Sequence, residues 1–193
     1  IDGQDFIDQV NDINMAIVGQ TGNLVYADKV LYGLRDVTGT VASIPLIASS
    51  IMSKKLAGGA DSILLDVKYG EGAFMKTIEE AKALASTMIA IGENLGRDVN
   101  AMITNMNQPL GKTIGNALEV YEAALTLQNK GPEDLKALCV LASSYMIHHA
   151  KITETLQEAE ALAHEVIDSG AAYAKFLEWV AYQKGDVSVF DDL

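Results

Sequence analysis

The sequence predicts an α/β fold with a parallel sheet, preceded by an all-helical segment, and three observations support this. Two apolar runs of strand length, "SILLDV" (62–67) and "VNAMIT" (99–104), flank a long amphipathic stretch at 74–96. A strand, a helix and a strand in this order form a βαβ unit with parallel strands. Aromatic residues are only 6% of a chain that is 49% apolar, as is typical of helices on a buried parallel sheet. Helix-end signals at 27–57 predict two helices before the first of these strands.

The other elements follow from local signals, taken in chain order. "MAIVG" (15–19) is apolar and ends in glycine, which predicts a short buried strand. The second helix of 27–57 has Ser43 as its N-cap and Pro45 in its first turn, and it ends at the glycine pair 58–59. "KYGEGA" predicts a glycine-rich loop. Apolar periodicity then predicts four more helices, at 115–128, 133–150, 155–169 and 171–183.

Composition excludes several classes of function. The 193 residues suffice for one or two domains with a packed core. The net charge of −12 argues against nucleic-acid binding and against an anionic membrane surface. Cys139 is the only cysteine, so no intrachain disulfide or cysteine-based zinc site can form, and its apolar neighbours predict a core position. With no apolar run of membrane-spanning length and no visible signal sequence, we expect a cytoplasmic protein. Because the chain opens on Ile1 as if mid-domain, we also expect a fragment of a longer subunit.

The helix after Ser43 carries polar residues on a face that should be apolar. Ile47, Ser50, Ile51 and Lys54 are spaced i, i+3, i+4 and i+7, so they share one face. In one interpretation Lys54 reaches solvent, Ser50 bonds to its own helix, and Arg35 pairs at the surface with one of two aspartates, Asp36 or Asp28. In the other, a guanidinium, a hydroxyl and an ammonium converge on a planar ligand with carbonyl oxygens and a ring N–H. The rest of the helix is almost wholly apolar, so exposing this face would leave Ile47 and Ile51 in water, which favours the second interpretation.

A second candidate site lies where the strand 62–67 ends. Ligands of open α/β sheets bind at the carboxyl ends of strands, and the loop there offers four residues: Asp66, Lys68, Gly70 and Gly72. An ordinary tight connection between strand and helix explains this loop about as well. The three histidines lack metal-ligand spacing, and no nucleophile motif is present, so covalent catalysis is not supported.

Two stretches carry a family resemblance. "LYGLRDVTGTVASIPLIASSIMSKKLAGGADSILLDVKYGEGAFMK" closely resembles the signature region of the pyrimidine-nucleoside phosphorylases, the family that includes thymidine phosphorylase, and "NQPLGKTIGNALEVYEA" resembles a second block of it. The resemblance covers essentially the whole chain. It implies that uridine, thymidine or deoxyuridine reacts with orthophosphate, as co-substrate, to give the free base and the (deoxy)ribose 1-phosphate, without a covalent enzyme intermediate or an organic cofactor. It matches the family's pyrimidine-binding positions to Tyr32, Arg35, Ile47, Ser50 and Lys54, of which Arg35, Ser50 and Lys54 carry the catalytic groups.

The resemblance also implies an organisation for the subunit. Residues 1–22 and 61–193 correspond to the α/β domain of the nucleoside phosphorylase and phosphoribosyltransferase type, and 23–60 to a small helical domain that binds the base and forms a homodimer. A K⁺ site is implied, with Leu110 and Thr113 (through backbone oxygens) and Glu122 among its ligands. The phosphate-binding segments of the family fall outside this chain, so the fragment alone is expected to be inactive.

Three alternatives stay open. A strict thymidine phosphorylase is one, although Ala42 stands where thymidine-specific members often carry an acidic residue, which favours the broader substrate range. An anthranilate-type phosphoribosyltransferase shares the fold but needs diphosphate and Mg²⁺ motifs that we do not find. A non-catalytic helical interaction module would leave the polar residues of the 43–57 helix unexplained.

Overall fold

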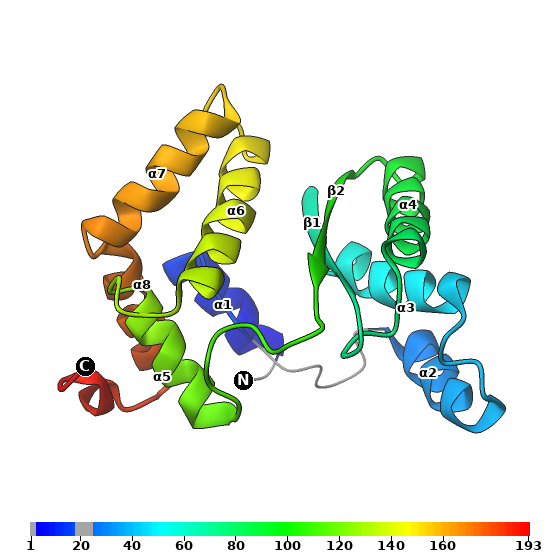
Figure 1. Cartoon of the computed structure of the whole chain (residues 1–193), viewed down its shortest axis with the longest axis horizontal. Helices are drawn as coiled ribbons and strands as arrows, with labels where there is room; N and C mark the ends of the chain where they lie inside the picture. The colour runs from blue at the N-terminus through cyan, green and yellow to red at the C-terminus, as the bar shows by residue number, and fades with distance from the viewer. Residues whose placement is uncertain (1–2, 18–24) are drawn as a thin grey trace. The chain divides into compact units, whose positions relative to one another are not determined.

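A computed structural model describes residues 3–17 and 25–193 of the chain (Figure 1). The chain divides into two compact units, Gly22–Gln108 and Ile1–Thr21 with Pro109–Leu193, and each is described by itself. The first holds a pair of parallel strands covered by helices, and the second is helical in its described part, so the expected α/β class is confirmed. Within the described ranges, no helix combines the length and the apolar character that crossing a bilayer requires.

The unit Gly22–Gln108 contains the predicted βαβ arrangement. Its elements are the helices α2 (Tyr26–Thr38) and α3 (Ile44–Ala57), the strand β1 (Ser62–Tyr69), the helix α4 (Ile78–Asn94) and the strand β2 (Asp98–Asn105). The strands pair in parallel from Ser62 opposite Asp98 to Tyr69 opposite Asn105. The predicted parallel orientation is therefore confirmed.

Local sequence accounts for where α4 begins. Thr77 is its N-cap: the threonine Oγ1 accepts a hydrogen bond from the backbone N–H of Glu80 at 3.2 Å, and the glutamate Oε2 accepts one from the N–H of Thr77 at 3.3 Å. This reciprocal capping box satisfies two N–H groups that a helix end leaves without partners. The helix starts at Ile78, four residues after the amphipathic stretch begins at Phe74.

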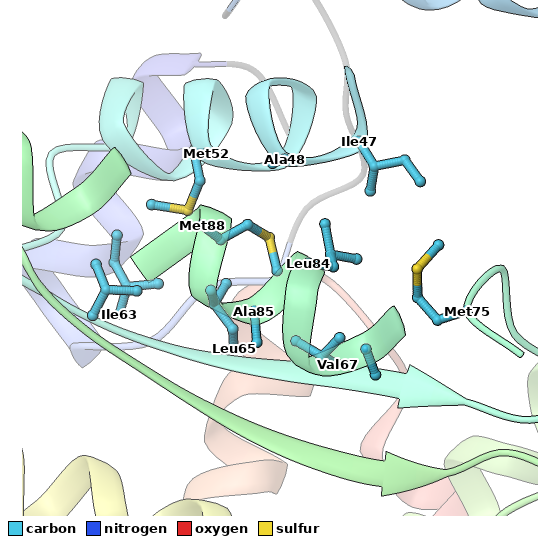
Figure 2. Close-up of a cluster of buried hydrophobic side chains, with 12 residues drawn as sticks. Ile47, Ala48, Met52, Ile63, Leu65, Val67, Met75, Leu84, Ala85 and Met88 are labelled. Carbon is cyan, nitrogen blue, oxygen red and sulfur yellow. The ribbon is translucent and has the colours of Figure 1, made fainter. Parts of the chain in front are cut away.

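The main core lies where α3, α4 and β1 meet. On β1, alternate residues are buried (Ile63, Leu65 and Val67), as expected for a strand with one face against helices. Figure 2 shows Met52 and Met88 in the space between α3 and α4, both almost fully buried. This packing fixes α3 on the βαβ unit and so positions the polar face of that helix.

The packing of α3 bears on the expected domain division. The predicted boundary after residue 60 falls inside the unit Gly22–Gln108, because Ile47, Ala48 and Met52 of α3 belong to the same core as α4 and β1. The compact units of this chain thus differ from the expected segments 1–22, 23–60 and 61–193, and the division into domains stays a prediction.

The second unit consists of α1 (Gly3–Ile13), α5 (Asn116–Thr126), α6 (Glu133–His149), α7 (Leu156–Asp168), α8 (Ala171–Tyr182) and the short 3₁₀ helix η1 (Val187–Phe190). Its small core joins α6 and α7 through Val140, Ala163 and Ile167. The buried amide of Gln9 on α1 donates to the backbone oxygen of Met15 at 3.0 Å. The four helices predicted after residue 115 are confirmed, with ends within two residues of those predicted.

Two sequence-based expectations for this unit are wrong. The described part of the expected strand 15–19, residues 15–17, has no regular structure, and Ile17 is exposed; residues 18 and 19 lie outside the described residues. The Met15 carbonyl bonds to Gln9 instead of to a neighbouring strand. Cys139 is exposed, because the buried face of α6 runs through Val140 and Ser144 and turns the preceding position outward.

Candidate active site

The polar residues predicted on α3 meet a buried carboxylate on α2. The Lys54 ammonium lies 2.5 Å from Asp28 Oδ2 and donates to the Ser50 Oγ at 2.9 Å. Asp28 and Ser50 are 7% and 5% exposed, whereas the Lys54 side chain keeps 27% of its surface. The three groups therefore form a compact polar cluster between the two helices, open to solvent on the lysine side.

Asp28 is ionised in this cluster despite its burial. Burial alone would raise the pKa of its carboxyl group, but hydrogen bonds from Lys54 and Ser50, together with the charges of Lys54 and Arg35, outweigh burial and lower the pKa. A buried carboxylate is stable only when it is paired and hydrogen-bonded in this way. The cluster thus contains a fixed negative charge that holds a lysine in place.

Arg35 lies on the same face of α2 as Asp28. Its Nη2 donates to the backbone oxygen of Val41, and its guanidinium carbon lies 5.2 Å from the centre of the Tyr32 ring, a cation–π distance. The residue is only 6% exposed, and its Nε has no hydrogen-bond partner among the described residues. A buried N–H without a partner is costly, so the described residues leave this donor of Arg35 unsatisfied.

The strand-end residues line a separate part of the unit. A cavity of about 800 Å³ opens between α3, the end of β1 and the loop after it, and its walls include Ile47, Asp66, Lys68 and Gly72. Arg35, Ser50 and Lys54 are not among its lining residues. Lys68 pairs with the Asp66 Oδ2 at 2.6 Å, and the Thr104 hydroxyl donates to Oδ1 at 2.5 Å. The structure therefore divides the expected site residues into two groups. One is the polar cluster with Ser50 and Lys54, near Arg35, and the other is the cavity at the end of β1, on whose side Ile47 lies.

The glycines of the loop after β1 allow two chain segments to approach each other. A Cβ on Gly70, which has φ of 118°, would lie 2.6 Å from the Asn107 Oδ1, and one on Gly72 would lie 2.8 Å from the Met106 backbone oxygen. The backbone N–H of Gly72 donates to that oxygen at 3.0 Å. Contact with the segment after β2 thus accounts for both glycines without a ligand.

Glu122 of the second unit is a buried carboxylate under a glycine turn. It is 6% exposed, its Oε1 accepts the backbone N–H of Lys112 at 2.9 Å, and a Cβ on Gly111 would overlap its Oε2. No lysine or arginine of residues 3–17 and 25–193 pairs with it in the structure. Of the other expected cation ligands, Thr113 donates its hydroxyl to the Leu118 backbone oxygen at 3.2 Å, and Leu110 is exposed in the same loop. A buried carboxylate with no lysine or arginine partner among the described residues is of the ligand type that hard cations prefer. Across the described residues, no group of three or more histidine, cysteine or acidic side chains gathers as a metal site.

Sequence reasoning named Asp28 only as an alternative surface partner of Arg35. The available signal was the spacing Asp28, Tyr32 and Arg35, at i, i+4 and i+7, which puts a second polar stripe on α2. The contact between Asp28 and Lys54 joins residues 26 positions apart, so the spacing within either helix does not reveal it.

Comparison with known proteins places the chain in a family. A model described as "Glycosyl transferase family, a/b domain" matches residues 2–173. The chain is 58% identical over 191 residues to the pyrimidine-nucleoside phosphorylases of Staphylococcus aureus (strain bovine RF122 / ET3-1) and Staphylococcus haemolyticus (strain JCSC1435). Each alignment covers 99% of this chain and 44% of the relative, so the chain spans less than half the length of these relatives. Because the family model matches well over half of its residues, the chain belongs to the glycosyl transferase family, a/b domain.

Proposed function

We propose that this chain carries the pyrimidine-binding part of a pyrimidine-nucleoside phosphorylase. The observation that supports this most is the buried cluster on α2 and α3, where Arg35, Ser50 and Lys54 supply two cations and a hydroxyl. The names and the 58% identity of the staphylococcal relatives support the same reaction. We assign two further residues to the walls for the base: Tyr32, whose ring lies against the Arg35 guanidinium, and Ile47, which faces the cavity at the end of β1.

The reaction breaks the bond between the sugar C1′ and the pyrimidine N1, and both electrons of that bond leave with the base. An oxygen of orthophosphate forms the new bond to C1′, so the products are the free pyrimidine and the pentose 1-phosphate. Negative charge develops on the ring nitrogens and carbonyl oxygens of the departing base. Arg35 and Lys54 stabilise this charge more in the transition state than in the substrate, which lowers the barrier.

The lysine has a donor available for this task. An ammonium group carries three N–H donors, and Lys54 gives one to Asp28 and one to Ser50. In the described part of the chain no acceptor takes the third. The third N–H of Lys54 and the Nε of Arg35 are the donors that we assign to the carbonyl oxygens of the base.

We assign the pentose side of the site to the strand-end group. Asp66, Lys68 and the loop with Gly70 and Gly72 lie at the carboxyl end of β1, where ligands of α/β sheets bind. Lys68 is already paired with Asp66, so the described residues offer no strong phosphate site there. We therefore expect the polypeptide of residues 1–193 to be inactive alone.

We further propose a monovalent cation, K⁺, held by the Glu122 carboxylate and by backbone oxygens of Leu110 and Thr113. The burial of that carboxylate without a lysine or arginine partner among the described residues supports this. No step of the reaction is assigned to the ion; its proposed role is to hold the 109–115 loop on α5.

A cytoplasmic homodimer formed through the helical segment 23–60 completes the proposal. Support for the dimer comes from α2, which exposes a series of apolar side chains that a second copy could cover: Tyr26, Val30, Leu31, Leu34 and Val37. The expected substrate range is broad, covering uridine, thymidine and deoxyuridine.

An assay of the full-length protein tests the proposal. Uridine and thymidine are incubated with and without orthophosphate, and the free base and pentose 1-phosphate are measured. We expect both bases to be released, in amounts equal to the sugar phosphate, only when phosphate is present. Release of base without phosphate would identify a hydrolase, and release of thymine alone would identify a strict thymidine phosphorylase.

A further inference from the structure

Asp28 is the one acidic group in the base-binding cluster, and the proposed reaction leaves it without a task. It stands on α2, whereas the lysine and serine it contacts stand on α3. A negative carboxylate beside a site that receives a developing anion should slow the reaction unless it also helps a catalytic group. Asp28 is buried and paired with Lys54, so the lysine is the group that it can help.

The geometry assigns Asp28 as a positioning residue that holds Lys54 toward the departing pyrimidine, and this role rests on the proposed function. The carboxylate fixes the ammonium at 2.5 Å. A lysine side chain has four rotatable carbon–carbon bonds, and without a partner it would sample solvent from its partly exposed position. With Asp28 in place, the third N–H has a set direction.

Asp28 acts on Ser50 through the lysine. The Ser50 Oγ accepts a hydrogen bond from the Lys54 ammonium at 2.9 Å. A remaining lone pair of this oxygen can accept a hydrogen bond from a ring N–H. By holding the ammonium, Asp28 therefore keeps both groups of α3 in place, the lysine as a donor to a carbonyl oxygen and the serine as an acceptor.

The substitution Asp28→Asn in the full-length protein tests this role. Asparagine has the shape of aspartate but no charge, so it holds the ammonium less firmly. Misplacing a catalytic group by about 1 Å can cost roughly 100-fold in rate, and we expect a fall in kcat for uridine of this order. Asp36→Asn, on an exposed position of the same helix, is the matched control and should leave kcat unchanged.

The base of the substrate provides the decisive readout. Fluorine at C5 makes uracil a better leaving group that depends less on a cation. If Asp28 acts through Lys54, then Asp28→Asn and Lys54→Ala should both lose much more rate with uridine than with 5-fluorouridine. The ratio of the two rates in one preparation does not depend on how much of the variant is folded.

A double substitution gives the second readout. In the Lys54→Ala background, Asp28→Asn should change kcat by less than about twofold, because the residue that it positions is already gone. Equal losses for both nucleosides, or a full additional loss in the Lys54→Ala background, would overturn the role. If the wild-type protein releases no base in the presence of phosphate, the proposed function fails, and the role of Asp28 fails with it. If the wild-type protein does release base, but the losses are equal for both nucleosides or the loss is fully additional in the Lys54→Ala background, only the role of Asp28 is refuted.

Discussion

At the scale of single residues, the site is built on buried charge. Asp28 and Arg35 are each less than one-tenth exposed. The Arg35 Nη2 donates to the backbone oxygen of Val41, and the Asp28 carboxylate is paired with the Lys54 ammonium of α3. Removing one partner of such a pair leaves an uncompensated charge and is strongly destabilising. Asp28 should therefore affect stability as well as activity.

The lowered pKa of Asp28 predicts a pH dependence of stability. Its carboxyl group binds a proton less readily in the folded than in the unfolded chain, so its contribution to stability is present above the unfolded pKa and is lost as pH falls through the folded one. The charged or polar groups facing it are Lys54, Ser50 and Arg35. Between about pH 5 and pH 2, we expect the free energy of unfolding of wild type to fall more than that of Asp28→Asn, by urea denaturation. Parallel curves for the two proteins would contradict the assignment.

Glu122 offers a residue-scale test of the proposed cation. In the full-length protein, K⁺ should raise the midpoint of thermal unfolding relative to tetramethylammonium at the same ionic strength, because an ion bound only by the folded state stabilises it. Glu122→Gln keeps an oxygen for the Lys112 N–H but removes the charge, so it should abolish the K⁺ effect. Glu119→Gln, on the same helix and exposed, is the control. An equal K⁺ effect in Glu122→Gln and wild type would show that the ion binds elsewhere or not at all.

At the scale of elements, α4 is fixed by a close approach to β2. Gly92 of α4 faces Val99 of β2, and a Cβ at the glycine would overlap the valine Cγ2 and lie 3.3 Å from the Met52 Cε. Val99 is buried at 5% exposure and has no room to yield. The glycine thus sets the distance between helix and strand on which α3 also depends.

The same substitution at two glycines should have opposite effects. Gly92→Ala overpacks the contact and should destabilise the protein by about 1–3 kcal/mol. Gly33→Ala, in α2, has nothing within 4 Å of the added Cβ, and alanine should stabilise that helix by about 0.5–1 kcal/mol. Both values can be read from urea unfolding. Two effects of the same sign would mean that the α4–β2 contact is looser than described.

The elements with strong periodicity were the ones that sequence could predict. The βαβ unit and the four late helices follow from long apolar patterns and helix-end signals, whereas α1 was missed although Phe6, Val10 and Ile13 have helical spacing. The strand expected at 15–19 rested on a short apolar run, which does not reveal whether a neighbouring strand exists. Periodicity within a segment is local information, and strand pairing is not.

The candidate site likewise has one part that sequence could predict and one part that it could not. The polar face of α3 was readable from the spacing of Ser50 and Lys54. The carboxylate across from it was not, because the contact with Asp28 depends on how two helices pack. The separation of the polar cluster on α2 and α3 from the cavity at the end of β1 also depends on packing that no motif encodes.

At the scale of the whole molecule, the family of the chain and the proposed reaction agree. The chain belongs to the glycosyl transferase family, and its staphylococcal relatives are named pyrimidine-nucleoside phosphorylases. The proposed reaction releases an anionic base, which gives a chemical reason for the buried Arg35 of α2 and the partly exposed Lys54 of α3. The chain as a whole is acidic, with a net charge of −12, so an anion has to be bound by local cations such as these.

The measurement that tests this central claim most directly is the effect of Lys54→Ala on phosphorolysis of uridine by the full-length protein. If Lys54 stabilises the departing base, kcat should fall by about 100- to 1,000-fold, as it does when one charge-stabilising donor is removed elsewhere, while KM for phosphate stays within about twofold because this lysine does not position phosphate. Lys29→Ala, an exposed lysine beside Asp28 on α2, should keep wild-type rates. Wild-type kcat in a folded Lys54→Ala protein would contradict the claim that the cluster on α2 and α3 receives the charge of the leaving pyrimidine.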